Sequence, residues 1–314
     1  MVSIANTTTA NKFVSGYHHV TAIASSPQKN YDFYHGVLGL RLVKQTVNFD
    51  DPSSYHLYYG DELAKPGSLI TFFTWPHLPV RTRGAAEIAA VGFAVPVDSL
   101  DFWKKRLTHK KIKFTEITRG EFSVLSLEDF EGMGVEIVGV NNPRDLRALH
   151  PDIPKEHALC GIEYTVLSVA NVAVIAQTLE TIGYSHVKTH DELHHFSRVH
   201  DHVFVFEDLS GHDALQGIGA VHHIAFAVSD DSEEMTMRSR IHDLGLFPTP
   251  QIDRTYFHSV YFREHNGILF EIATNGPGFA IDEKIESLGQ KLCLPPQYEK
   301  QRAEIVANLQ PFKL

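Results

Sequence analysis

Two apolar stretches of this sequence each begin with a pair of histidines. The stretch YHHVTAIA covers residues 17–24, and the similar stretch VHHIAFAV covers residues 221–228. Histidine binds metal ions and can act as an acid or base near neutral pH. The repeated pair therefore raises the question of whether these distant histidines meet at one site.

The alternation of side chains along a strand assigns each histidine to one face. In 221–228, His223 shares its face with alanines, whereas His222 lies with the bulky apolar residues. In the stretch GILFEIAT (267–274), Glu271 likewise lies opposite the bulkiest side chains. A carboxylate in so apolar a strand is costly unless a cation pairs with it. Glu271 is therefore expected to face a cation.

The first stretch offers His19 in the place equivalent to His223, with Thr21 on the same face. Thr71 stands where a second copy of Glu271 would be expected. Two imidazoles and one carboxylate that leave coordination positions open are the arrangement suited to non-haem Fe(II). We therefore predict one metal site formed by His19, His223 and Glu271.

The preceding histidine of each pair has two open roles. By alternation His18 and His222 point away from the predicted metal, unless twist at the strand start turns them inward. They are then either structural residues or residues that support the site. The further histidines of HDELHHFSRVHDH (190–202) have mixed spacing and many charges, which favours a solvated hairpin.

A pattern of strand, helix and further strands recurs four times along the chain, and this repeat predicts four βαβββ modules in an α+β fold. An Asn or Asp near each helix start suits an N-cap, and three glycines suit C-terminal caps. These residues are Asn30, Asp98, Asn171 and Asp231, and Gly39, Gly183 and Gly245. The second module carries an acid, Glu136, but has Val91 and Gly92 where a histidine would stand, and the third has Glu163 and Tyr164 there. We therefore expect modules one and four to pair around the metal, and modules two and three to form a scaffold.

The proline-containing stretch between the halves sets the predicted domain boundaries. We predict an N-terminal half at 1–145 with modules at about 15–75 and 86–141, a linker at 146–158, a C-terminal half at 159–280 with modules at about 159–208 and 219–275, and a helical tail at 281–314.

Composition excludes several classes of function. The formal net charge is −10, and no basic stripe is present that could neutralise phosphates, so we expect no nucleic-acid partner. The first residues lack the apolar core of a signal peptide, and no later run is long enough to span a membrane. The two cysteines, Cys160 and Cys293, are far apart, which favours free thiols in the cytoplasm.

The motifs resemble those of the vicinal oxygen chelate superfamily, which contains glyoxalases and extradiol dioxygenases. They are carried by GYHHVTAIASSPQKNYDFYHGVLGLRLVKQTVNFDD, VHHIAFAV and GILFEIAT. The whole chain is similar to the hydroquinone ring-cleaving dioxygenases, including SYHLYYGDELAKPGSLITFF and SLGQKLCLPPQYE. The resemblance implies two pseudo-symmetric half-barrel pairs followed by a helical tail. It also implies Fe(II), or alternatively Mn(II), at His19, His223 and Glu271.

The resemblance further implies roles around the metal. Arg254 and Tyr261 would stabilise negative charge on the substrate, and His222 would act as an acid or base. Thr21 and His18 would contact the substrate. If HNG (265–267) is a three-residue hairpin loop with Gly267 left-handed, Tyr261 lies across from Glu271; a two-residue turn would place Phe262 there instead.

These expectations combine into one predicted function. The chain is expected to be a non-haem iron, extradiol-type dioxygenase that inserts both atoms of O2 into a hydroquinone or catechol. Its partners would be a small aromatic substrate and O2, and assembly into a homo-oligomer is compatible with the sequence. The alternatives are a glyoxalase-type isomerase or lyase, which would normally need a fourth protein ligand, and a non-catalytic resistance protein that binds aromatic ligands.

Overall fold

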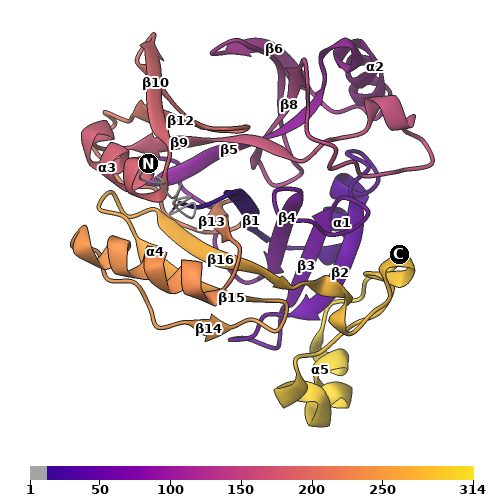
Figure 1. Cartoon of the computed structure of the whole chain (residues 1–314). Helices are drawn as coiled ribbons and strands as arrows, with labels where there is room; N and C mark the ends of the chain where they lie inside the picture. The colour runs from indigo at the N-terminus through magenta and orange to yellow at the C-terminus, as the bar shows by residue number, and fades with distance from the viewer. Residues whose placement is uncertain (1–12) are drawn as a thin grey trace, which may run out of the picture.

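Two eight-stranded sheets form the body of the protein in the computed structural model, which describes residues 13–314 (Figure 1). The strands of modules one and four are β1 Gly16–Ala24, β2 Arg41–Val47, β3 Tyr55–Gly60, β4 Leu69–Thr74, β13 Val221–Val228, β14 Ile252–Asp253, β15 Phe257–Arg263 and β16 Leu269–Pro277. Those of modules two and three are β5 Glu87–Pro96, β6 Phe114–Arg119, β7 Phe122–Glu128, β8 Gly134–Val140, β9 Ile162–Val169, β10 Ser185–His190, β11 Leu193–Arg198 and β12 Asp201–Glu207.

The order of strands confirms the expected pairing of modules. The first sheet runs β14-β15-β16-β13-β1-β4-β3-β2, so the first and fourth modules join through the antiparallel pair β1–β13. The second sheet runs β10-β11-β12-β9-β5-β8-β7-β6, and its modules join through β5–β9. In each module the first strand also pairs in parallel with the last. The predicted α+β fold of four βαβββ modules is confirmed.

The helices that complete the modules are α1 Pro27–Tyr34, α2 Leu100–His109, α3 Val172–Ile182 and α4 Asp231–Asp243. The Asn171 side chain caps α3 as expected, and Gly183 ends it in the left-handed conformation at φ 111°. The expected cap Asn30 was wrong, because Ser26 caps α1 and Asn30 lies buried inside it. The side chain of Asp230, one residue before the expected Asp231, caps α4.

The two faces of the first sheet differ as the alternation predicted. Ile224 and Phe226 of β13 join the main apolar core, and α4 packs over this outer face (Figure 1). Ala225 and Ala273 belong to a second, smaller cluster on the opposite face. Small side chains on that inner face leave room for the imidazoles and the carboxylate.

The C-terminal tail packs against module one, and a buried lysine of that module binds two carboxylates of the tail. It comprises the short 3-10 helices η3 Phe279–Ile281, η4 Ile285–Ser287 and η5 Pro296–Gln301, and the helix α5 Arg302–Asn308. Lys44 of β2 is fully buried, and its ammonium bonds the carboxylates of Asp282, at 2.6 Å, and Glu283. The Tyr256 hydroxyl also donates to Asp282 at 2.9 Å. The tail therefore ties the loop before β15 to the far edge of the same sheet.

The predicted boundaries of the two halves, the linker and the tail stay a prediction. The expectation that the chain has no signal peptide concerns residues 1–12, which lie outside the described residues. Among the helices that the structure describes, none has the length and apolar character required to span a membrane.

Glu234 on α4 gives the fold a predicted pH dependence. Its side chain is buried, and burial raises the pKa of this carboxyl from 4.5 to about 7. Because the folded state holds the proton more tightly than the unfolded state, this contribution is complete below pH 4.5 and is lost as the pH rises through 7. We expect Glu234→Gln to reduce the fall in unfolding free energy between pH 5 and pH 8 by on the order of 2 kcal/mol.

Thermal unfolding at both pH values, compared between the wild type and the variant, checks this expectation. Asp243→Asn, a change at an exposed position at the end of the same helix, is the matched control. The expectation is contradicted if the free energy of unfolding falls by the same amount between pH 5 and pH 8 in the wild type and in Glu234→Gln.

Candidate metal centre

A shared irregularity of the central strand pair positions the histidines. The pairing register skips His18 on β1 and His222 on β13, so each strand carries a bulge at the first residue of its histidine pair. A bulge redirects the extra side chain and increases the local twist. Because of the bulge, both histidines of each pair can turn toward the same face of the sheet, which explains why the histidines occur in pairs.

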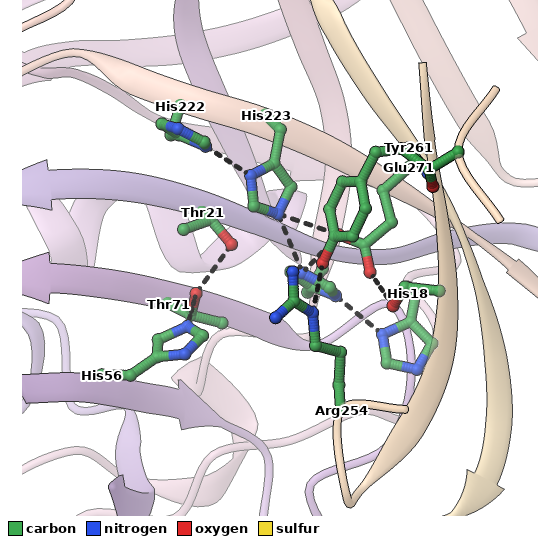
Figure 2. A network of polar contacts seen from close by, with 12 residues as sticks. His18, Thr21, His56, Thr71, His222, His223, Arg254, Tyr261 and Glu271 are labelled. Atoms are coloured by element: carbon green, nitrogen blue, oxygen red, sulfur yellow. Dashed lines mark hydrogen bonds and ion pairs between the residues drawn. The ribbon is translucent and has the colours of Figure 1, made fainter. Parts of the chain in front are cut away.

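His19, His223 and Glu271 converge on that inner face. Figure 2 shows His223 and Glu271 beside one another. The Nε2 atoms of His19 and His223 lie 3.3 Å apart. Oε2 of Glu271 lies 2.9 Å from the Nε2 atom of His223 and 3.4 Å from that of His19. All three side chains are buried.

The chemistry of this donor set fits a divalent metal ion. Oε2 of Glu271 is buried and accepts no correctly oriented hydrogen bond, although two imidazole nitrogens lie close to it. Burial would raise the pKa of Glu271, but the facing imidazoles of His19 and His223 hold it well below its ordinary value. An ionised carboxylate and two imidazole nitrogens directed at one point match the facial ligand set of non-haem iron sites.

His18 and His222 each bond the neighbouring candidate ligand. Nδ1 of His18 lies 2.9 Å from Nδ1 of His19, and Nδ1 of His222 lies 2.7 Å from Nδ1 of His223. A histidine that offers Nε2 to a metal carries its proton on Nδ1, so the ligand donates and its neighbour accepts. Burial, followed by the adjacent imidazole, lowers the pKa of both His18 and His222 to about 3. The neutral imidazoles can therefore accept these bonds.

Arg254 and Tyr261 lie beside the three donors, as Figure 2 shows. Tyr261 of β15 pairs directly with Glu271 of β16, and Gly267 in the connecting loop has φ 103°. The predicted three-residue hairpin register is therefore confirmed, and Phe262 is excluded from this place. Nε of Arg254 donates to the Tyr261 hydroxyl at 3.2 Å, which leaves the tyrosine proton available to another acceptor.

A polar chain from module one lies on the other side of the centre, and the sequence reasoning missed two of its members, His56 and Tyr58. The hydroxyls of Thr21 and Thr71 lie 2.8 Å apart, and Nε2 of His56 lies 2.9 Å from the Thr71 hydroxyl. The Tyr58 hydroxyl lies 2.9 Å from Nδ1 of the same imidazole. Tyr58 pairs with Thr71 as Tyr261 pairs with Glu271, so the repeat itself could have identified this chain.

A narrow cavity of about 30 Å³ opens between these two sides. Its walls include the rings of Phe49, Phe73 and Phe257, and its polar lining includes His56 and Arg254. Nη1 of Arg254 also bonds the exposed carboxylate of Asp50 across the cavity at 3.2 Å. Nothing in the local sequence around Asp50 indicates this contact with a distant loop.

The paired sheets and the His-His-Glu cluster define a repeat protein of the βαβββ class with a candidate metal site. The Glyoxalase/Bleomycin resistance protein/Dioxygenase superfamily profile matches residues 16–137. The chain belongs to this superfamily, and the relatives described next extend the match over nearly its whole length.

Two curated relatives place the chain more closely. It is 40% identical over 310 residues to the "Putative ring-cleaving dioxygenase MhqO" of Bacillus subtilis, which covers 96% of this chain and 98% of the relative. It is 32% identical to the chlorohydroquinone/hydroquinone 1,2-dioxygenase of Sphingobium indicum, with 94% and 96% covered. The family resemblance inferred from the motifs is confirmed.

Solved structures agree on the fold. A crystal structure titled as a "putative dioxygenase" from Bacillus subtilis matches with TM-score 0.91 and 38% identity, covering 96% of this chain and 98% of that one. Glyoxalase I from Zea mays matches with TM-score 0.62 at 11% identity, covering 83% and 92%, which shows the shared fold alone.

The first prediction from the site concerns metal content. We expect His223→Ala and Glu271→Gln each to lower bound iron at least tenfold after anaerobic loading, because each removes one of three converging donors. Elemental analysis of the desalted protein measures the loss. Arg119→Met/Glu136→Gln, which removes both members of a buried ion pair in the other sheet, is the matched control and should retain the wild-type metal content. Full metal content in either site variant would exclude this ligand set.

The second prediction concerns His56. His56→Phe keeps a ring of similar shape but leaves the Thr71 and Tyr58 hydroxyls without their partner, so we expect kcat/KM to fall about tenfold. Metal content should stay unchanged, because the imidazole is not among the converging donors. Steady-state oxygen uptake and elemental analysis on the same preparation test both statements. Unchanged kcat/KM, or parallel loss of metal, would contradict them.

Proposed function

We propose that this protein is an Fe(II)-dependent dioxygenase that cleaves the ring of a hydroquinone with O2. The observation that carries this proposal is the convergence of three buried donor atoms beside a tyrosine hydroxyl and a guanidinium. The relatives named for ring cleavage support the reaction class, and the Sphingobium indicum relative, named for chlorohydroquinone and hydroquinone, supports the substrate class. Mn(II) is the alternative metal, because it accepts the same ligands.

His19, His223 and Glu271 would hold the ion on one side and leave its other positions facing the cavity. A bound Fe(II) would supply the redox chemistry that couples an electron-rich phenol to O2. The bonds from His18 and His222 would fix the ligand imidazoles in the tautomer that presents Nε2. The acid or base role expected for His222 remains a proposal beside this positioning role.

Arg254 and Tyr261 would bind the substrate oxygen. The guanidinium favours the ionised phenol, and the free tyrosine proton can be donated to the same oxygen. Donors fixed in a buried site stabilise developing charge more effectively than water does, because they need no reorganisation. On the opposite side the Thr21 hydroxyl, held by Thr71 and His56, would orient the other reactant.

The cavity must widen before a ring can enter. A volume of about 30 Å³ holds roughly one water molecule, far less than a phenol. Arg254 and Asp50 both line it, and the exposed Asp50 carboxylate is screened by solvent, which weakens its contact with the largely buried guanidinium. Arg254 can therefore exchange Asp50 for an incoming phenolate at little cost in free energy. The three phenylalanines would then hold the ring by its faces and exclude water.

Oxygen uptake tests this function directly. Protein loaded anaerobically with Fe(II) is mixed with hydroquinone, chlorohydroquinone or catechol, and consumed O2 is compared with lost substrate. We expect one O2 for each hydroquinone, a product that contains both oxygen atoms by ¹⁸O labelling, and loss of turnover in His223→Ala. Absence of uptake by a metal-loaded protein would refute the proposal, and isomerisation of a hemithioacetal without O2 would favour the glyoxalase alternative.

A further inference from the structure

The half of the protein built from modules two and three repeats the geometry of the metal centre without its histidines. The register of its central pair skips Ala89 on β5 and Glu163 on β9. These two bulges match those at His222 and His18. The second sheet therefore has the same pair of backbone bulges that shapes the metal site in the first sheet.

The strand register identifies which residues replace the metal ligands. Glu136 of β8 pairs with Gly92 of β5, and Gly92 pairs across the sheet with Tyr164. In the metal half, Glu271 and His19 likewise share one pairing partner on β13. The correspondence is therefore Tyr164 for His19, Ala90 for His223, and Glu136 for Glu271.

This register corrects one expectation from the sequence. Val91 and Gly92 were expected in the place of the missing histidine, but the bulge shifts that place to Ala90. The buried Glu136 has its own partners: Nε of Arg119 donates to its Oε2 at 2.8 Å, and the Tyr164 hydroxyl also donates to it. A guanidinium neutralises the carboxylate here.

A cavity of about 780 Å³ opens beside this guanidinium. Its volume is in the range of small-molecule sites, which are mostly apolar with a few convergent polar groups. Three half-buried rings, those of Phe114, Phe130 and Phe206, line it. The small side chains of Ala89 and Ala90 at its base leave the space that imidazoles would otherwise fill.

The unpaired charges of this cavity are positive. Arg119 uses Nε and Nη2 on Glu136, which leaves its Nη1 with no partner among the described residues. Lys111 and Lys113 line the same cavity and form no ion pair within the described part of the chain. The acids of the lining are already engaged, since Glu128 pairs with Arg83 and Asp129 accepts from Tyr34 and from backbone amides.

We propose that this cavity is a second, non-catalytic binding site for an aromatic carboxylate. The phenylalanine rings bind the aromatic part, and the positive groups of the lining, those of Arg119, Lys111 and Lys113, attract the carboxylate. A divalent metal does not suit this place, because Glu136 is already paired with a guanidinium. The proposal is independent of the function proposed for the metal half, since none of its lining residues belongs to that centre.

Isothermal titration of the metal-loaded protein with 2-naphthoate tests this site, with the neutral isostere 2-naphthamide as the comparison ligand. We expect saturable binding of one naphthoate per chain and at least tenfold weaker binding of the amide. Lys111→Gln/Lys113→Gln should weaken naphthoate about fivefold, consistent with two exposed charges. Ala89→Phe, which fills the cavity without changing charge, should abolish binding. Lys105→Gln, on α2, is the control and should bind as the wild type does.

Two further variants separate this site from other sources of binding. His223→Ala should retain naphthoate affinity, because the metal centre is not involved. Arg119→Met/Glu136→Gln removes both members of the buried pair, so that no unpaired charge destabilises the fold, and should lose discrimination between acid and amide. The proposal is wrong if the wild type does not bind naphthoate, or if it binds naphthoate and naphthamide with equal affinity. It is also wrong if naphthoate binding is lost in His223→Ala but kept in Ala89→Phe.

Discussion

The bulged antiparallel pair of β1 and β13 is the constraint on which the metal centre depends. One strand contributes His19, the other contributes His223 and lies beside the strand of Glu271, so the site exists only where the first and fourth modules meet. The carboxylate between the imidazoles is fully buried, and an unpaired buried charge is costly. A cation at this point would therefore stabilise the joint between the modules as well as complete the proposed reaction centre.

The two halves show how one backbone can supply different polar centres. Both sheets carry bulges at matched places and both keep one carboxylate on the strand next to the central pair. In one half imidazoles surround the carboxylate, and in the other a guanidinium and a phenol do so. The backbone determines where a buried polar group can lie, whereas a few side chains determine whether its partner is a metal ion or an arginine.

Much of this architecture could be predicted from local sequence patterns. Alternation along 221–228 and 267–274 assigned His223 and Glu271 to one face. The loop containing Gly267 left two registers open, and the structure has the one that pairs Tyr261 with Glu271. The repeat gave the pairing of modules, because ligands from the first and last modules had to meet. Family resemblance, and not residue pattern alone, pointed to Arg254 and Tyr261.

Other features depend on contacts that no local pattern records. The bulges at His18 and His222 arise from pairing between distant strands, so strict alternation placed these imidazoles on the wrong face. The contact between Asp50 and Arg254 joins loops of different modules. The hydrogen bonds of His56 require knowledge of which strand lies beside β3. In each case the missing information was tertiary.

The same strand order has a consequence for how the chain is made. During synthesis β1 emerges first, yet its partner β13 follows only after the first three modules have left the ribosome. Until then one edge of the N-terminal sheet has unpaired amide and carbonyl groups, and such edges recruit other chains. The nascent polypeptide thus passes through a stage in which its metal-binding strand is also its most aggregation-prone surface, and closure by the fourth module ends that exposure.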